Sequence, residues 1–238
     1  MEKLKNSTIG SLVTEDYHFA DVFKRYGIDF CCGGNITVKE ACSKNNLDYQ
    51  EVLYELEAVE QIEPARTVVN DLTPDQLADH IITQHHTYVR QNLPLIIEYA
   101  DKVASVHGER HPELLEINQL LLVLDKDLSA HMNKEEVILF PYIKELVTSG
   151  IRAAAPFGSV ENPIRTMMEE HDNAGSIMKS IALMSSQYTP PEDACTTYRV
   201  LYQKLEEFEN DLHRHIHLEN NILFPKAVAL ELQQQQTD

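Results

Sequence analysis

A fifteen-residue pattern that occurs twice constrains the fold of this chain more than any other feature. The segments are DLSAHMNKEEVILFP (127–141) and DLHRHIHLENNILFP (211–225), and both read D-L-x-x-H-x-x-x-E-x-x-I-L-F-P. Residues four apart lie on the same face of an α-helix, so each copy aligns an aspartate, a histidine and a glutamate in one polar stripe. We therefore expect both copies to be helical and to hold these stripes in equivalent positions.

Two more histidines stand at matched distances before the two copies. His86 is 45 residues before His131, and His171 is 44 residues before His215. The midpoint of each pair falls in a segment that is typical of a turn. Residues equidistant from the turn of an antiparallel helical hairpin lie at the same level. His86 should therefore face His131, and His171 should face His215.

The rest of the chain after residue 73 supports a helical bundle. Thr73 and Pro74 make a typical helix start, and long helical patterns follow as far as residue 232. Short turns are expected at 107–112 and 188–194, and a longer connection is expected at 149–163. The prediction is an all-α protein whose residues 74–232 form an up-and-down four-helix bundle. Proline should kink the helices, at Pro94 and at the end of each repeat.

Residues 1–62 predict a separate N-terminal domain of three short helices. The first is expected from Thr14 to Tyr26, the second after an N-cap at Thr37, and the third after Asp48. Between the first two, GIDFCCGGN should form a tight turn that holds Cys31 and Cys32. Residues 63–73 have little helical pattern and are interpreted as a linker.

Docking the two hairpins face to face brings four histidines and two glutamates into one layer of the bundle interior. They are His86, His131, Glu135, His171, His215 and Glu219. Burying these groups without partners would cost many kcal/mol, and a pair of metal ions removes that cost. Nitrogen and oxygen ligands from four helices are typical of a carboxylate-bridged di-iron or di-manganese site. The two glutamates would bridge the metals, and each metal would take two imidazoles.

Other polar residues near the repeats are expected to lie around the metal ligands or farther from them, without binding the metal. Asp127 and Asp211, one turn before the repeat histidines, should orient the imidazoles or guide ions inward. His85 is expected beside the site or at the surface, and His213 and His217 are expected in solvent because they lie off the polar stripe. His107, at a hairpin tip, would be ~30 Å from His86 along a straight helix, so only a fold-back would make it a ligand.

Composition narrows the classes of partner. The formal net charge is −18, so phosphate backbones and anionic lipid surfaces would repel this chain. We expect no nucleic-acid or membrane partner. The start of the chain lacks the apolar core of a signal peptide, and four cysteines are too few for a disulfide framework. A cytoplasmic protein with free thiols is expected.

The bundle half resembles the hemerythrin-like di-iron proteins, and the whole chain resembles the RIC family (repair of iron centres). The residues that carry this resemblance are YGIDFCCGG (26–34), QHHTYVRQNLP (84–94), HMNKEEVILFP (131–141), EEHDNAG (169–175) and HLENNILFP (217–225). Carried over position by position, the family's iron ligands fall on the same six residues that the repeat indicates.

The resemblance implies a cytoplasmic stress protein, often dimeric, that restores iron–sulfur clusters damaged by nitric oxide or peroxide. Its partners would be the damaged iron–sulfur proteins, and a labile oxo- and carboxylate-bridged di-iron centre would donate the iron. Asp127 and Glu170 would be stations on the path of the iron, and Asp211 would also lie beside that path. Cys31 and Cys32 would take iron, react with nitric oxide, contact the client protein, or simply fill a turn.

Three alternatives remain open at the level of sequence, and no catalytic residue is assigned. The same irons could reduce nitric oxide or peroxide, which requires sustained turnover with an electron donor. They could bind oxygen reversibly as simpler hemerythrins do, although such a carrier has no need of a Cys-Cys domain. The bundle could also be stabilised by zinc, which metal analysis would reveal.

Overall fold

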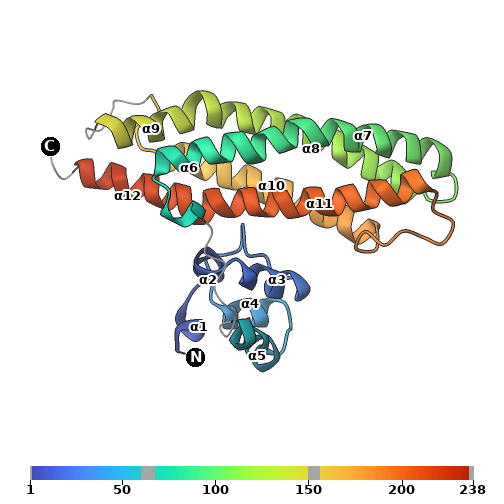
Figure 1. The fold of residues 1–238 in the computed structure, drawn as a ribbon, viewed down its shortest axis with the longest axis horizontal. Helices are drawn as coiled ribbons and strands as arrows, with labels where there is room; N and C mark the ends of the chain where they lie inside the picture. Colours follow the sequence, from blue (N-terminus) through green and yellow to red (C-terminus); the bar gives the residue numbers. More distant parts are fainter. Residues whose placement is uncertain (1, 60–67, 150–155, 236–238) are drawn as a thin grey trace.

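The computed structural model describes residues 2–59, 68–149 and 156–235, and the regular structure of these residues is helical throughout. A single antiparallel bridge joins Thr8 and Thr37. Four long helical rods lie side by side, and a cluster of short N-terminal helices packs against one flank of the bundle (Figure 1). The all-α prediction and the bundle architecture are confirmed.

Each rod except the third is built from several segments. The first rod is α6 (Pro74–Ile81), η2 (Ile82–His86) and α7 (Thr87–His107). The second is α8 (Glu113–Lys134), η3 (Glu135–Leu139) and α9 (Phe140–Ser149). The third is α10 (Glu161–Met184), and the fourth is α11 (Thr196–Leu218), η4 (Glu219–Leu223) and α12 (Phe224–Gln235).

The segments η2, η3 and η4 are single π-helical turns of five residues each. Two of them end directly before Phe-Pro, at Pro141 and Pro225. Proline removes the backbone donor of one helical hydrogen bond and crowds the preceding turn, and a wider turn accommodates it. By contrast, α7 continues through Pro94. Each π turn contains one of the six candidate ligands.

The N-terminal region has five short helices among the described residues, so the expectation of three is wrong. They are α1 (Glu2–Asn6), α2 (Ile9–Glu15), α3 (His18–Arg25), α4 (Val38–Lys44) and α5 (Tyr49–Val59). The expected helix at 14–26 breaks at Asp16, whose backbone is extended and whose carboxylate accepts a hydrogen bond from the backbone N–H of His18 at 3.0 Å. Asp16 therefore ends one helix and opens the next.

The other local predictions in this region hold. Thr37 and Glu40 form a capping box at the start of α4, and Gly27 has the left-handed φ of 63° that ends α3. Residues 63–67 of the expected linker lie outside the described residues, and the rest of it contains a 3₁₀ turn, η1 (Val68–Asp71). The proposed boundary at residue 62 also lies outside them.

Two apolar clusters sandwich a polar layer inside the bundle. One includes Leu128, Met132 and Ile216 and continues into the N-terminal helices. The other includes Ile81 and Phe224. The six candidate ligands occur where residues of one cluster give way to residues of the other, and all six are buried. No helix in the described part of the chain combines the length and the hydropathy that a membrane crossing requires.

Candidate metal centre

The structure brings the six predicted residues together in the bundle interior. All six are at most 2% exposed: His86, His131, Glu135, His171, His215 and Glu219. They form two groups of four, in which every chosen ligand atom lies within 4.8 Å of the others. One group contains His86 and His215, the other contains His131 and His171, and both share the two glutamates. Each group could hold one cation, and the two groups have both carboxylates in common.

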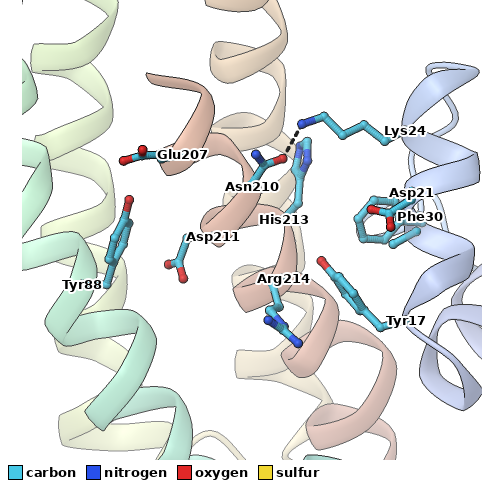
Figure 2. A pocket seen from close by; sticks show the side chains of 11 residues that line it. Tyr17, Asp21, Lys24, Phe30, Tyr88, Glu207, Asn210, Asp211, His213 and Arg214 are labelled. Carbon is cyan, nitrogen blue, oxygen red and sulfur yellow. Dashed lines mark hydrogen bonds between the residues drawn. The ribbon is translucent and has the colours of Figure 1, made fainter. Parts of the chain in front are cut away.

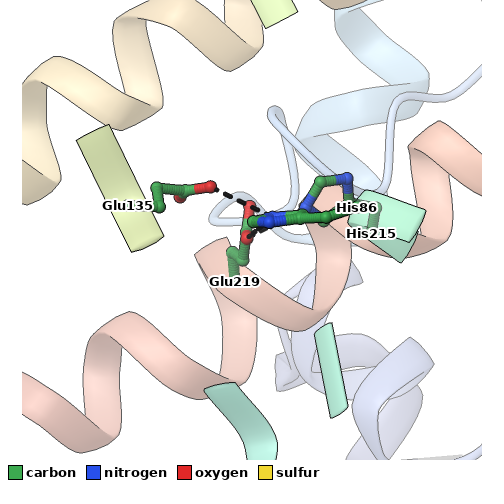
Figure 3. Close-up of side chains that lie close together, drawn as sticks. All are labelled: His86, Glu135, His215 and Glu219. Atoms are coloured by element: carbon green, nitrogen blue, oxygen red, sulfur yellow. Dashed lines mark hydrogen bonds and ion pairs between the residues drawn. The ribbon is translucent and has the colours of Figure 1, made fainter. Parts of the chain in front are cut away.

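The Nε2 atoms of the imidazoles converge on the carboxylate oxygens. His86 and His131 both lie 3.3 Å from Oε2 of Glu135. His171 lies 3.0 Å from Oε2 of Glu219, and His215 lies 3.0 Å from Oε1 of the same residue. Figure 3 shows how the side chains of one group, from three different rods, point to a common centre. His86 and His131 thus meet at one carboxylate, as the hairpin geometry predicts.

Several buried polar atoms at this centre make no hydrogen bond of standard geometry within the described residues, although some of them lie at ion-pair distance from a neighbouring ligand group. They are Nε2 of His86, both carboxylate oxygens of Glu135, and Oε2 of Glu219. Leaving such atoms without a hydrogen bond costs ~1–3 kcal/mol each, and more when they are charged. Divalent cations would satisfy them, because neutral imidazole and carboxylate oxygen are ordinary ligands of iron, manganese and zinc. The residues present therefore fit a pair of metal ions.

The outer nitrogen of three imidazoles is held by an acceptor. Nδ1 of His86 lies 2.7 Å from Glu136, Nδ1 of His131 lies 2.9 Å from Glu170, and Nδ1 of His171 lies 2.9 Å from Asn220. An acceptor at Nδ1 keeps the hydrogen there and leaves Nε2 to bind a metal. His215 has no hydrogen-bond partner at Nδ1 within the described ranges, and the ring of His85 stacks on it at 5.5 Å.

Glu136 and Asn220 were not among the candidates from the sequence. Both directly follow the glutamate of their copy of the repeat, Glu135 and Glu219. A π turn rotates the next residue toward the neighbouring rod, so each one reaches an imidazole of another helix. The sequence does hold a signal for these two residues, because both copies of the repeat have a polar residue directly after the glutamate. A regular α-helix would turn that residue away from the Asp-His-Glu face, so helical periodicity alone does not indicate its contact with an imidazole.

Neither repeat aspartate makes a hydrogen bond to one of the four candidate ligand histidines in the described part of the chain. Asp127 is exposed and accepts a hydrogen bond from Asn173 at 3.3 Å, while Asp211 lies 3.0 Å from Nδ1 of His85. Four residues of α-helix turn ~40° past a full circle, so the stripe drifts off the interior face. Glu170, which the family resemblance indicated, contacts both His131 and the amine of Lys134.

The expectation that His213 and His217 are solvated is wrong. His217 is 2% exposed, and His213 is half-buried. The loop between α3 and α4 covers both, because the ring of Phe30 in that loop packs at 5.9 Å from His213 and at 6.1 Å from His217. His107 is not near the centre: its Nε2 lies 3.3 Å from the thiol of Cys195 at the hairpin tips.

Charge pairing controls the protonation of the centre. Burial alone would lower the pKa of His86, but Glu135 and Glu219 outweigh it and raise this pKa to about 10. Burial would likewise lower the pKa of His131, but the carboxylate of Glu135 outweighs it and raises this pKa to about 9. Burial would raise the pKa of Glu219, yet His215 and His171 hold it well below its usual range. Carboxylates that stay ionised are ready to bind a cation.

Cys31 and Cys32 lie where the N-terminal helices meet the bundle. Their sulfur atoms are 3.8 Å apart as free thiols, with Cys31 buried and Cys32 half-buried. The carbonyl of Cys31 accepts hydrogen bonds from the side-chain amides of Asn220 at 3.4 Å and Asn221 at 3.1 Å. We call residues 29–32 the thiol loop. The thiol contact with Cys32, burial and the charge of Asp29 raise the pKa of Cys31 well above its ordinary value.

A cavity of about 620 Å³ opens between α3 and the bundle (Figure 2). Its walls include Tyr17, Lys24, Tyr88, Asp211 and Arg214. Figure 2 shows Asp211 on the bundle side, and this residue contacts His85, which stacks on the candidate ligand His215. The cavity therefore ends two side chains away from the metal centre.

Comparisons with known proteins agree with this geometry. Residues 77–227 match the model of the hemerythrin HHE cation binding domain, and residues 5–60 match a domain of unknown function. The chain is 34% identical to the iron-sulfur cluster repair protein YtfE of Escherichia coli O17:K52:H18 (strain UMN026 / ExPEC), covering 95% of this chain and 99% of that protein. It is 38% identical to a probable iron-sulfur cluster repair protein of Haemophilus influenzae, covering 87% and 90%.

Proposed function

Because this chain belongs to the family of iron-sulfur cluster repair proteins represented by these relatives, we propose that it repairs clusters damaged by nitrosative or oxidative stress. It would do so by donating iron from the buried centre to the damaged protein. The observation that carries this proposal is the pair of four-residue groups sharing Glu135 and Glu219.

The cations proposed for the centre are two iron ions, bridged by the two glutamates and an oxo group. His86 and His215 would hold one ion, and His131 and His171 the other, which matches the two groups of the structure. An electron donor that reduces this pair would weaken the oxo bridge and give ferrous ions, which are the cargo that a damaged cluster lacks. Nitrogen and oxygen ligands hold ferrous iron less tightly than the thiolates of a cluster, so transfer from the centre to the cluster is thermodynamically favourable.

The protein's own residues prepare this transfer. Acceptors on Nδ1 fix the imidazoles of His86, His131 and His171, so that ligand exchange happens without reorganising the bundle. Glu170 is half-buried and lies between His131 and the surface residue Lys134, so it is a suitable carboxylate for an ion that leaves that position. His215, with no hydrogen bond at Nδ1 in the described chain, would release its ion with less resistance.

The test is reactivation of a cluster enzyme inactivated by nitric oxide. Iron-loaded protein should restore its activity, and Glu219→Leu should abolish the effect because both cation positions lose a shared ligand. Glu116→Leu, an exposed glutamate on α8, is the matched control and should remain active. Equal reactivation by the metal-free protein would contradict iron donation. Sustained consumption of nitric oxide with an electron donor would instead support a reductase at the same site.

A further inference from the structure

The thiol loop contains a second group of metal-ligating atoms that the centre does not use. The carboxylate of Asp29 accepts hydrogen bonds from the backbone N–H groups of Cys31 and Cys32, both at 2.9 Å. The same oxygen lies 3.2 Å from the sulfur of Cys31, and the two sulfurs are 3.8 Å apart. All three ligand atoms lie within 4.8 Å of one another.

The spacing of the two sulfurs suits a shared cation. Two thiolates bound at ~2.3 Å to a tetrahedral ion stand ~3.8 Å apart, whereas a disulfide requires ~2.05 Å. The observed separation of 3.8 Å equals the first value. Asp29 adds an oxygen ligand of opposite charge to the ion, on the same side of the loop.

The loop is held in place and open on one side. The backbone N–H of Gly10 donates to the carbonyl of Gly34 at 2.7 Å, and a Cβ on Gly34 would meet the carbonyl of Phe30 at 2.5 Å. Glycine is therefore needed where the chain returns after the thiols. Asp29 is exposed, Cys32 is half-buried and Cys31 is buried. Such a site can take up and release an ion without unfolding.

The thiol loop is also joined to the main centre. Asn220 donates to the carbonyl of Cys31 at 3.4 Å, and its side-chain oxygen lies 2.9 Å from Nδ1 of the candidate ligand His171. One turn further along α10, Gly175 faces Cys32: a Cβ there would lie 3.8 Å from its sulfur. The thiol of Cys32 therefore stands next to the rod that carries His171.

We propose that Asp29, Cys31 and Cys32 bind one thiophilic divalent cation, and that Asn220 positions this site against the metal centre. Binding releases two protons, one from each thiol, and forms two metal–sulfur bonds without any change of oxidation state. Where the proposed iron donation operates, the cation is ferrous iron on its way to the client. The binding site itself does not require that function.

Cadmium titration of the full chain tests the site, because cadmium thiolates absorb in the ultraviolet and imidazole or carboxylate complexes do not. The unaltered protein should develop a thiolate band that saturates at one cadmium per chain. Cys32→Ser should lose the band. Asp29→Asn should weaken binding about tenfold, since asparagine keeps the acceptor oxygen for the two N–H groups but lacks the charge.

Two controls separate this site from the other thiols and from the metal centre. Cys195→Ser removes the exposed thiol at the hairpin tips and should leave the band intact. Glu219→Gln disables the main centre and should also leave it intact, so failure of iron donation and failure of this site give different results. Absence of the band in the unaltered protein, or a full band in Cys32→Ser, would overturn the proposal. Asp29→Asn retains the test if Cys32→Ser does not fold.

Discussion

The side-chain oxygen of Asn220 lies 2.9 Å from Nδ1 of His171. An amide oxygen only accepts hydrogen bonds, so this contact places the hydrogen on Nδ1 and leaves Nε2 to face Glu219, 3.0 Å away. The amide nitrogen of the same residue donates to the carbonyl of Cys31. One side chain thus connects a candidate ligand with the thiol loop.

Replacing Asn220 by alanine should weaken metal binding at the centre. Without an acceptor at Nδ1, His171 loses both its fixed tautomer and its fixed ring orientation. Loss of such a contact typically lowers metal affinity ~10–100-fold. Competition with a chromophoric chelator measures the change.

Asn221→Ala is the matched control for that experiment. Asn221 also donates to the carbonyl of Cys31, at 3.1 Å, and its amide contacts His217, which is outside the set of six. Its loss should loosen the N-terminal helices and leave the affinity for metal nearly unchanged. Equal losses in both variants would show that domain docking, and not the contact with His171, controls affinity.

Gly10→Ala should destabilise the seam between the N-terminal helices and the bundle. A Cβ at Gly10 would overlap the side-chain oxygen of Asn221 and would lie 3.1 Å from the carbonyl of Gly34. Asn221 would have to move and break its hydrogen bond to the thiol loop. Overpacking of this kind costs ~1–3 kcal/mol, and denaturant unfolding with limited proteolysis would detect it.

Gly175→Ala, in contrast to Gly10→Ala, should stabilise the fold. Gly175 lies inside α10, and a Cβ there would meet only the sulfur of Cys32, at the ordinary contact distance of 3.8 Å. Alanine is favoured over glycine by ~1 kcal/mol in a helix interior, so the variant should be more stable. A marked loss of stability in the same unfolding assay would show that Cys32 needs more room than this structure gives it.

The repeat and its hairpin spacing predicted which six side chains meet, because a hairpin fixes levels and a period of four fixes faces. The same reasoning placed Asp127 on that face as well, and there it failed. Each step of four residues drifts around the helix, and a π turn at Glu135 resets the face only for the residues after it. The contact between Glu136 and His86 depends on this π turn, so the periodicity of the sequence does not predict it.

The packing of the N-terminal region against the bundle cannot be predicted from helical periodicity. His213 and His217 lie off the polar stripe of their own helix, which correctly separates them from the centre. Their burial comes from Tyr17 and Phe30, about 190 residues earlier in the sequence. Nothing in the local pattern of α11 indicates such a partner. The break at Asp16 is similar, since a side-chain cap competed with an otherwise continuous helical pattern.

Glu209 should make stability fall with rising pH. Burial raises its pKa, and Lys24 and Tyr188 only partly oppose that shift. A carboxyl whose folded pKa is raised stabilises the fold below its unfolded value of ~4.3, and that contribution is lost as pH rises through the folded value. Glu209→Gln should therefore raise the melting temperature at pH 8 and lose this advantage near pH 4. Glu207→Gln, an exposed neighbour, should change little at either pH.

Removing metal should lower the melting temperature of the chain. The buried carboxylates of Glu135 and Glu219 then keep only imidazole partners, and the binding free energy is lost. At a metal concentration of ~100 times the dissociation constant, that free energy is ~2.7 kcal/mol for one site, or a shift of roughly 5–10 °C. Calorimetry with and without a chelator measures it. Glu219→Leu should lose the part of this shift that the centre contributes and keep only what an ion at the thiol loop adds, while Glu116→Leu should keep the whole shift. A full shift in Glu219→Leu would mean that the stabilising ions bind elsewhere.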